Sequence, residues 1–286
     1  MKLPGFAYAR PTSIEAALAL LADDTQESKV LAGGQSLLAA MNFRLSSPQR
    51  LIDINRIAAL TGISLDAGMV RIGALTRHVE IARSDLVARE LPLLAHAIAH
   101  VAHPAIRNRG TFGGSLALAD PAAEMPAVAL ASDATLIARS LHGERRIAVA
   151  DYFLGLYETA LVADELLIAA EFPAAGDEPA GWAFAEQARR HGDFANAGVI
   201  IRRAGGQNGT RVVLFGVSDR PVRSTAAEAA LGAGELDDDR INQAAGCVCD
   251  GIDIFGDQHA SDTMKRHLCG VLIRRALREL AHGVPA

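Results

Sequence analysis

The sequence predicts an α+β protein of two domains, and three observations lead to this prediction. Short apolar strands alternate with helical stretches through the first part of the chain, and beyond it three strand-like stretches precede three helical ones. A segment rich in glycine, proline and acid, AAGDEPAG at 174–181, separates the two parts. Since 286 residues suffice for two domains of roughly 100–200 residues each, we expect one domain at 1–176 and another at 177–286.

The first domain is expected to mix short strands with helices. Thr12 and Glu15 match a capping box, which predicts an amphipathic helix that ends near Asp23. The strand predicted at 29–31 runs into AGGQS at 32–36, and helical composition follows, so the local order is strand, glycine turn, helix. Further strands are predicted at 51–54, 63–65, 70–72, 135–139, 145–149 and 165–172, and further helices at 91–100 and from Asp120, as N-cap, through Ala129.

The second domain has its strands first and its helices afterwards. This order is typical of a small α+β domain in which the helices cover one face of an antiparallel sheet. Strands are predicted at 182–186, 197–202 and 211–217, and helices near 224–232, 240–251 and 260–281.

Composition excludes several classes of function. With 28 basic and 33 acidic residues and a net charge of −5, the chain lacks the basic excess of a nucleic-acid binder. Charge interrupts every apolar run before the roughly 20 residues that a membrane span needs, and no signal peptide is recognisable, so we expect a cytoplasmic protein without a membrane span. The cysteines, Cys247, Cys249 and Cys269, lack the number and spacing of an iron–sulfur site and are interpreted as buried free thiols.

Two glycine-containing segments have the composition of an anion site. A pyrophosphate is held best by backbone N–H groups where missing side chains let the main chain approach, as Gly33 and Gly34 would allow. Ser36 adds a hydroxyl donor, and a following helix would direct its partial positive charge at the phosphates. The same residue types recur at Thr111, Gly113, Gly114 and Ser115.

Each segment alone is weak evidence, because a Gly-Gly pair in a protein with 26 glycines is more often a turn or a helix stop. Both segments also depart from the common nucleotide fingerprints, since AGGQS lacks GxGxxG and no GK[ST] of a P-loop occurs. The residues by themselves therefore predict an anionic ligand held between two loops.

Several motifs together resemble those of one family. The chain opens with F-x-Y-x-R-P at 6–11, continues with AGGQSLLAAMNFRL at 32–45 followed by LIDINRI, and carries RNRGTFGGSLALADPAAEMP at 107–126. A fourth motif, EQARRHGDFANAGV, lies at 186–199 in the second domain. In this order, over nearly the whole chain, they are similar to the medium, FAD-binding subunits of the molybdenum hydroxylases, the group of xanthine dehydrogenase and carbon monoxide dehydrogenase.

The resemblance implies a fold and a set of cofactor contacts. The fold would be a two-part FAD-binding domain of the vanillyl-alcohol oxidase (PCMH) type, followed by a carbon monoxide dehydrogenase flavoprotein type domain of three antiparallel strands and a helical bundle. The two glycine segments would hold the FAD pyrophosphate, Glu124 matches an acidic position near the ribose, and Leu161 a position that covers the adenine. The residues implied in FAD binding are Ala32, Gly33, Gly34, Gln35, Ser36, Thr111, Phe112, Gly113, Gly114, Ser115, Glu124 and Leu161.

Partners and an activity are implied as well. In such enzymes a large subunit with a molybdopterin centre oxidises the substrate, and a small subunit relays electrons through [2Fe-2S] clusters. This chain would be an oxidoreductase subunit that takes those electrons on FAD and passes them to an external acceptor, in a dimer of heterotrimers. Molybdopterin and the clusters would lie only in the partner subunits, and this chain would need no catalytic acid or base of its own.

Two other functions stay open at this point. A self-sufficient FAD-dependent oxidase or dehydrogenase of the same fold superfamily would need its own substrate pocket with a base beside the flavin. A scaffold or ligand-binding protein would use the two segments merely as turns. The substrate and the electron acceptor cannot be read from this chain, because the family selects its substrate in the large subunit.

Some positions depart from the family pattern. Phe112 stands where Ile or Val is commoner, Ser115 where Asn is commoner, and Glu186 where some members have Lys, which weakens any contact assigned to Glu186. A polar and aromatic cluster could approach the flavin or form a solvated hairpin end. Its members are Arg189, Arg190, Asp193 and Phe194.

Three histidines have a spacing that suggests a metal site. Because no cysteine or carboxylate completes a ligand set, a helix surface explains them more simply, and we predict no metal in this chain. They are His96, His100 and His103.

Overall fold

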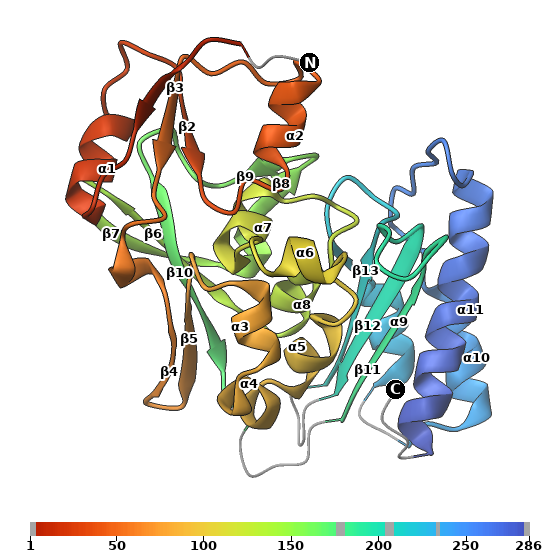
Figure 1. Ribbon diagram of the computed structural model, residues 1–286. Helices are drawn as coiled ribbons and strands as arrows, with labels where there is room; N and C mark the ends of the chain where they lie inside the picture. The colour runs from red at the N-terminus through yellow and green to blue at the C-terminus, as the bar shows by residue number, and fades with distance from the viewer. Residues whose placement is uncertain (1–3, 176–180, 204–208, 233–234, 283–286) are drawn as a thin grey trace.

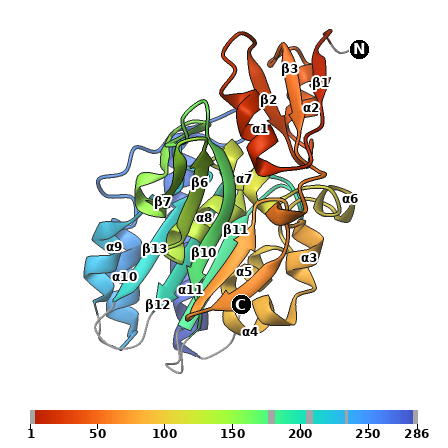
Figure 2. The ribbon, with the colours of Figure 1, turned by 90° about the vertical axis from the view of Figure 1, so that its left-hand side faces the viewer.

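The structure is a computed structural model that describes residues 4–175, 181–203, 209–232 and 235–282. Four layers are stacked across the molecule: an antiparallel sheet, a layer of short helices, a second antiparallel sheet and a further helical layer (Figure 1). A small sheet from the N-terminal residues lies at one end of the molecule (Figure 2). The architecture is therefore α+β, as predicted.

The small N-terminal sheet is parallel. Its region comprises β1 (Ala7–Ala9), α1 (Ile14–Leu21), β2 (Ser28–Leu31), α2 (Leu37–Asn42), β3 (Arg50–Asp53) and the short helix η1 (Ala58–Leu60). Strands β1 and β2 pair with opposite edges of β3. Helix α1 buries Ile14 and Leu18 in a core that includes Ile52 of β3. The glycine segment at 32–36 thus leaves the sheet directly after β2.

The second part of the N-terminal domain is a five-stranded antiparallel sheet. Its strands are β4 (Ile63–Asp66), β5 (Met69–Gly73), β6 (Thr135–Ser140), β7 (Gly143–Ala148) and β10 (Leu166–Pro173). Both predicted hairpins form, and β10 lies between them in the order β4-β5-β10-β6-β7. Because β10 pairs on both edges and is covered on its faces, most of its side chains are buried.

Short helices cover the inner face of this sheet. They and the small elements after β7 are α3 (His78–Ala82), α4 (Asp85–Glu90), α5 (Pro92–Ala97), α6 (Pro104–Arg107), α7 (Phe112–Leu118), α8 (Glu124–Ala131), η2 (Val149–Asp151), β8 (Phe153–Gly155) and β9 (Glu158–Thr159). Helix α8 is buried all round because it packs between the first domain and the second sheet (Figure 1). Sequence reasoning anticipated α5 and α8 and missed α3, α4 and α6, which are too short to show a helical period.

The second domain is a sheet with helices on one face, as predicted. It comprises β11 (Gly181–Gln187), β12 (Ala197–Arg203), β13 (Thr210–Phe215), β14 (Val222–Arg223), α9 (Thr225–Leu231), α10 (Asp238–Cys247) and α11 (Asp262–Ala281). Three long antiparallel strands follow in order, and β14 adds a short edge strand. Side chains alternate across the sheet, so that Val199 and Leu214 face the domain's own helices while Phe184 and Ile200 face the first domain.

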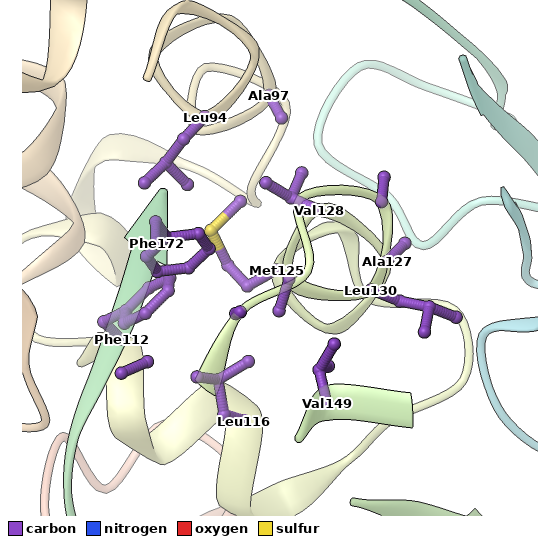
Figure 3. Packing of buried hydrophobic residues seen from close by; sticks show 14 of the residues in the cluster. Leu94, Ala97, Phe112, Leu116, Met125, Ala127, Val128, Leu130, Val149 and Phe172 are labelled. Carbon is purple, nitrogen blue, oxygen red and sulfur yellow. The ribbon is translucent and has the colours of Figure 1, made fainter. Parts of the chain in front are cut away.

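One hydrophobic core joins the two domains. Figure 3 shows part of it, where Phe112, Met125 and Phe172 meet. The same cluster continues into the second sheet through Phe184 and Phe215, whose ring centroids lie 5.9 Å apart. A shared apolar core of this kind favours a fixed arrangement of the two domains.

Two predicted helix caps are wrong. Ser13, not Thr12, caps α1, because the hydroxyl of Ser13 accepts the backbone N–H three residues later. Asp120 does not cap α8, whose N-cap is Ala123. The Asp120 carboxylate instead accepts the N–H two residues on, and this local turn competes with the cap and delays the helix.

The predictions for the cysteines, the domain boundary and membrane spans have different outcomes. Cys269 is buried as predicted, but Cys247 and Cys249 are partly exposed, and all three are free thiols. The expected boundary between residues 176 and 177 lies outside the described residues. Across the described ranges, no helix combines the length and apolar character needed to cross a membrane.

Candidate cofactor site

The first glycine segment, Ala32–Ser36, turns the chain from β2 into α2, as predicted (Figure 1). Within the described part of the chain, the backbone N–H groups of 33–36 donate to no protein acceptor. Gln35 stiffens the turn by donating from Nε2 to the Gly33 carbonyl at 3.1 Å. The Ser36 hydroxyl makes no capping bond to α2. Several donors are therefore available here for an anion.

The second glycine segment, 111–115, is the N-cap and first turn of α7 and not the loop that the sequence suggests. Thr111 is the N-cap, and its hydroxyl accepts from the Gly114 N–H at 3.2 Å. The two preceding N–H groups donate, each at 2.9 Å, to carbonyls just after β5. A capping threonine followed by apolar residues at helical spacing explains why a helix forms in spite of the glycines. Most of this segment's donors are consequently used inside the protein.

The first segment packs at the buried Gly33 against Arg109 and Gly110, which directly precede the second segment. A Cβ built on Gly33 would lie 2.5 Å from the carbonyl oxygen of Arg109 and 2.9 Å from the Cα of Gly110. No side chain fits at that distance, so a glycine is required where the first segment meets the approach to the second. This proximity is compatible with the prediction of one anionic ligand held between the two segments.

Positive charge lies beside the junction. Arg77 is half-buried, and its pKa is lowered first by burial and then by the nearby Arg109. Two adjacent guanidinium groups repel one another, and an anion bound between the segments would relieve that repulsion. Beneath Gly110 lies His78, whose pKa is lowered to about 4 by burial and, to a lesser extent, by Arg107. His78 is therefore neutral at physiological pH.

Phe112 belongs to the core as well as to the second segment. Its side chain is fully buried, with its ring centroid 5.8 Å from that of Phe172 (Figure 3). The larger ring that replaces the commoner Ile or Val fills this interior space. Its side chain therefore points away from the site, and the hydroxyl of the half-buried Ser115 is the polar group that this region adds.

Glu124 and Leu161 come from elements other than the two glycine segments. Glu124 is 5% exposed at the start of α8. Burial, followed by the nearby Glu186, raises the pKa of Glu124 to about 7. Leu161 follows β9, is half-buried and packs against the main core. Their contacts with ribose and adenine stay predictions.

His96, on α5, and His100, just after α5, lie against the second domain, while His103 is exposed. The helix surface predicted for these histidines is therefore partly covered. The ring centroid of His96 lies 5.2 Å from that of Trp182. His100 Nδ1 lies 2.9 Å from Glu186 Oε1, so the glutamate of the second domain pairs with a group on the first. Among the described residues, no group of three histidine, cysteine or acidic side chains has an arrangement that would hold a metal ion.

The segment from Arg189 to Phe194 is a turn beside the first domain. Arg189, Arg190 and Phe194 are exposed. Gly192 packs so closely on the chain between α5 and α6 that a Cβ there would lie 2.7 Å from the carbonyl of Ala102. The approach of this turn to the flavin stays a prediction.

Sequence reasoning missed Asn55, which contacts the first segment, and Arg77, which contacts the second segment and its approach. Asn55 lies in the LIDINRI motif, whose residue types do not by themselves indicate a contact with a glycine segment. Arg77 lies on the missed helix α3 as its N-cap, and nothing in the local sequence marks it. Contacts between chain segments so far apart become visible only in the folded structure.

Two family models match the chain. The model described as the FAD binding domain in molybdopterin dehydrogenase matches residues 4–175, and the model described as the CO dehydrogenase flavoprotein C-terminal domain matches residues 182–280. The chain belongs to the FAD-binding medium subunits of the molybdenum hydroxylases. The family-level predictions of an oxidoreductase subunit with a two-part FAD-binding domain and a small C-terminal domain are confirmed.

Similar medium subunits match over nearly their full lengths. The nicotine 6-hydroxylase medium subunit of Paenarthrobacter nicotinovorans is 39% identical over 98% of both chains. The 6-hydroxypseudooxynicotine dehydrogenase complex subunit alpha of the same organism is 38% identical over 99% of this chain and 96% of its own. Among solved structures, carbon monoxide dehydrogenase from Hydrogenophaga pseudoflava has a chain that is 35% identical, covers 99% of both chains and superposes with a TM-score of 0.94.

Proposed function

We propose that this chain holds the pyrophosphate of FAD at its two glycine segments and serves as the electron-transferring subunit of a molybdenum hydroxylase. The first segment carries the proposal, because the backbone N–H groups of 33–36 have no protein acceptor in the described part of the chain. Arg77 and Arg109 lie next to it and add positive charge. Such a cluster of donors and cations fits an anion with several oxygens.

The other proposed contacts follow from position in the family. Ser36 and Ser115 would add hydroxyl donors, and the N-terminal end of α2 would direct its dipole at the phosphates. Leu161 would cover the adenine, and Glu124 would lie near the ribose. The proposed FAD-binding set is therefore Ala32, Gly33, Gly34, Gln35, Ser36, Thr111, Phe112, Gly113, Gly114, Ser115, Glu124 and Leu161.

Electron transfer is the chemistry that FAD supplies when bound, while the protein binds it, orients it and excludes water. We propose that the electrons arrive from [2Fe-2S] clusters of a small subunit and leave to an external acceptor. A large subunit with molybdopterin would oxidise the substrate, and the complex would be a dimer of heterotrimers. The names of the relatives as medium chains or complex subunits support this assembly.

The substrate is proposed to be selected outside this chain. Relatives that are 34% to 39% identical bear names for substrates as different as nicotine, caffeine and carbon monoxide. Since those medium chains are about equally similar to this one, the part of the complex that distinguishes the substrates lies elsewhere. We expect neither an acid nor a base in this chain to act on the substrate.

The first test is the flavin content of the purified chain. An absorption spectrum, followed by acid release and chromatography, should find one FAD per chain and no FMN. Gly33→Val and Gly114→Val should each lose it, because both side chains would meet atoms of Arg109 or Thr111 closer than van der Waals contact allows. Gly246→Val is the matched control, since a Cβ there meets nothing within 4 Å. No flavin in the wild type, even after incubation with FAD, would contradict the proposal.

The second test concerns the partners. An affinity tag on this chain should co-purify two further subunits from the source cells, with molybdenum and iron in the complex. When substrate is added, the flavin absorbance should bleach in the complex and stay unchanged in the isolated chain. Bleaching of the isolated chain by a substrate would instead support the self-sufficient oxidase.

A further inference from the structure

Asn55 and Arg77 connect the two glycine segments through hydrogen bonds. Asn55 follows β3, and its Nδ2 donates to the carbonyl of Ala32, the first residue of the first segment, at 2.8 Å. Its Oδ1 accepts from the guanidinium of Arg77 at 2.5 Å. Arg77 donates from its other terminal nitrogen to the carbonyl of Arg109, which precedes the second segment. The four residues form a continuous bridge beside the contact of Gly33.

Further hydrogen bonds fix both Asn55 and Arg77 in place. The buried carboxylate of Asp53 accepts from the backbone N–H of Asn55 at 2.9 Å and from its Nδ2 at 2.6 Å. Asp53 is held in turn by Arg10, at 3.2 Å. On the other side, the backbone of Arg77 forms an antiparallel bridge with Thr111. Asn55 therefore moves with β3, and Arg77 moves with the second segment.

The amide of Asn55 and both terminal nitrogens of Arg77 make hydrogen bonds within the protein. Asn55 has two amide hydrogens, one for Ala32 and one for Asp53, and its oxygen accepts from Arg77. The two terminal nitrogens of Arg77 are bonded to Asn55 and Arg109. Because these groups face the two segments, a role in holding the segments together explains them better than a direct bond to a ligand.

We propose that Asn55 and Arg77 are positioning residues that set the distance between the two glycine segments and thereby the affinity for FAD. The inference rests on the proposed function, since it assumes that the segments hold the cofactor. Charge-assisted hydrogen bonds in a half-buried place are strong and geometrically specific. Without the bridge, the two segments would be kept in register by van der Waals packing such as that at Gly33.

The test is the dissociation constant of FAD, measured by fluorescence titration of the apo chain, for Asn55→Ala, Arg77→Met and the double variant. Each single change should weaken binding at least about tenfold, the equivalent of losing one well-formed hydrogen bond to a charged group. The double variant should bind no more weakly than either single variant, because one broken link already opens the bridge. Fully additive losses would overturn the proposal of a single bridge.

Arg77→Lys separates geometry from charge. Lysine keeps the positive charge but lacks the planar fork that reaches two acceptors at once, so Arg77→Lys should recover only a small part of the FAD affinity lost in Arg77→Met. Recovery of wild-type affinity by lysine would show that charge alone acts, and would overturn the positioning role.

Arg50→Met is the matched structural control. Arg50 is a buried arginine of the same small sheet, bonded to Asp23, Ser28 and the carbonyl of Leu20 and to neither glycine segment. This variant should lower the melting temperature of the apo chain yet keep the FAD affinity of the folded fraction.

The variants also separate the two proposals. If Asn55→Ala and Arg77→Met bind FAD as tightly as the wild type while Gly33→Val loses FAD, the positioning role of Asn55 and Arg77 is overturned and the proposed function stands. Wild-type affinity in Gly33→Val and Gly114→Val would overturn the proposed function itself.

Discussion

The two glycine segments are similar in sequence and different in structure. Both place a Gly-Gly pair near hydroxyl side chains. In Ala32–Ser36 the backbone N–H groups of the described structure have no protein acceptor, and the turn opens into the short helix α2. In 111–115 the N–H groups are used by the Thr111 cap and by carbonyls after β5, and the segment begins α7. The first segment is available for a ligand, and the second is built into the fold.

This difference suggests that the two segments have different roles. The second segment is a rigid support, which we call the floor, because Gly113 packs directly on Ala74 and Phe112 is buried in the core. The first segment supplies the donors and is held against that floor at Gly33 and through Asn55. Changes in the second segment should therefore affect folding most, and changes in the first should affect ligand binding most.

The largest effect is expected for Gly113→Ala. The added Cβ would lie 2.6 Å from the Cα of Ala74 and 2.8 Å from its carbonyl oxygen, so the backbone of α7 or of the segment after β5 has to move. Overpacking of this kind costs about 3 kcal/mol or more where backbone is the obstacle. Urea unfolding of the apo chain measures this loss in the free energy of unfolding. A smaller loss for Gly113→Ala than for Gly33→Ala would contradict the role of the second segment as the floor.

Acid should weaken the second segment selectively through His78. Its folded pKa is about 4, against an ordinary value of 6.5, because burial disfavours the charged form. Between these values the unfolded chain binds more protons, so this contribution is complete above about pH 6.5 and is lost as the pH falls to about 4. The loss amounts to about 3 kcal/mol. His78→Gln should remove that part of the pH dependence of unfolding, and an unchanged pH profile would contradict it.

Gly33→Ala should act on the ligand more than on the fold. Its Cβ would push the first segment away from Arg109 and Gly110, which lie at the junction and outside the core. We expect FAD to bind about a hundredfold more weakly, which corresponds to about 2.7 kcal/mol. Titration of the apo variant with FAD measures this, beside Gly246→Ala as a control with open space at its Cβ. Equal FAD affinities of Gly33→Ala and Gly246→Ala would show that the close contact at Gly33 does not contribute to ligand binding.

The smallest effect is expected for Thr111→Ala. It removes the hydroxyl that accepts from the Gly114 N–H and should cost about 1 kcal/mol, the usual value of an N-cap. Thr111→Ser keeps the hydroxyl and should keep most of that stability. Thermal unfolding of both variants without FAD checks the difference, and equal losses would show that the cap contributes nothing.

Much of the fold could be predicted because its elements carry local signals. The hairpin around Ala67 and Gly68 and the three strands of the second domain are marked by turn residues and apolar runs. The cap of α1 was placed one residue too early, since Thr12 and Ser13 are both competent N-caps and only the folded geometry selects between them. Helices as short as α3 and α6 have no detectable period.

The candidate site was predictable in part. The glycine segments could be found from residue type and resemblance, but their contact at Gly33 could not, because it depends on how β2 and α7 pack. The same limit hid Asn55 and Arg77, which are far apart in sequence. The local sequence around His96 and His100 predicts only a helix surface, because nothing in it indicates the second domain that covers them.

Calorimetric titration of the apo chain with FAD and with FMN is the decisive test of binding through the pyrophosphate, because FMN has the same ring system and lacks the pyrophosphate and adenosine. One FAD should bind per chain and FMN at least about a hundredfold more weakly, with ADP competing against FAD. Equal binding of FMN and FAD, or no binding of either, would contradict binding through the pyrophosphate.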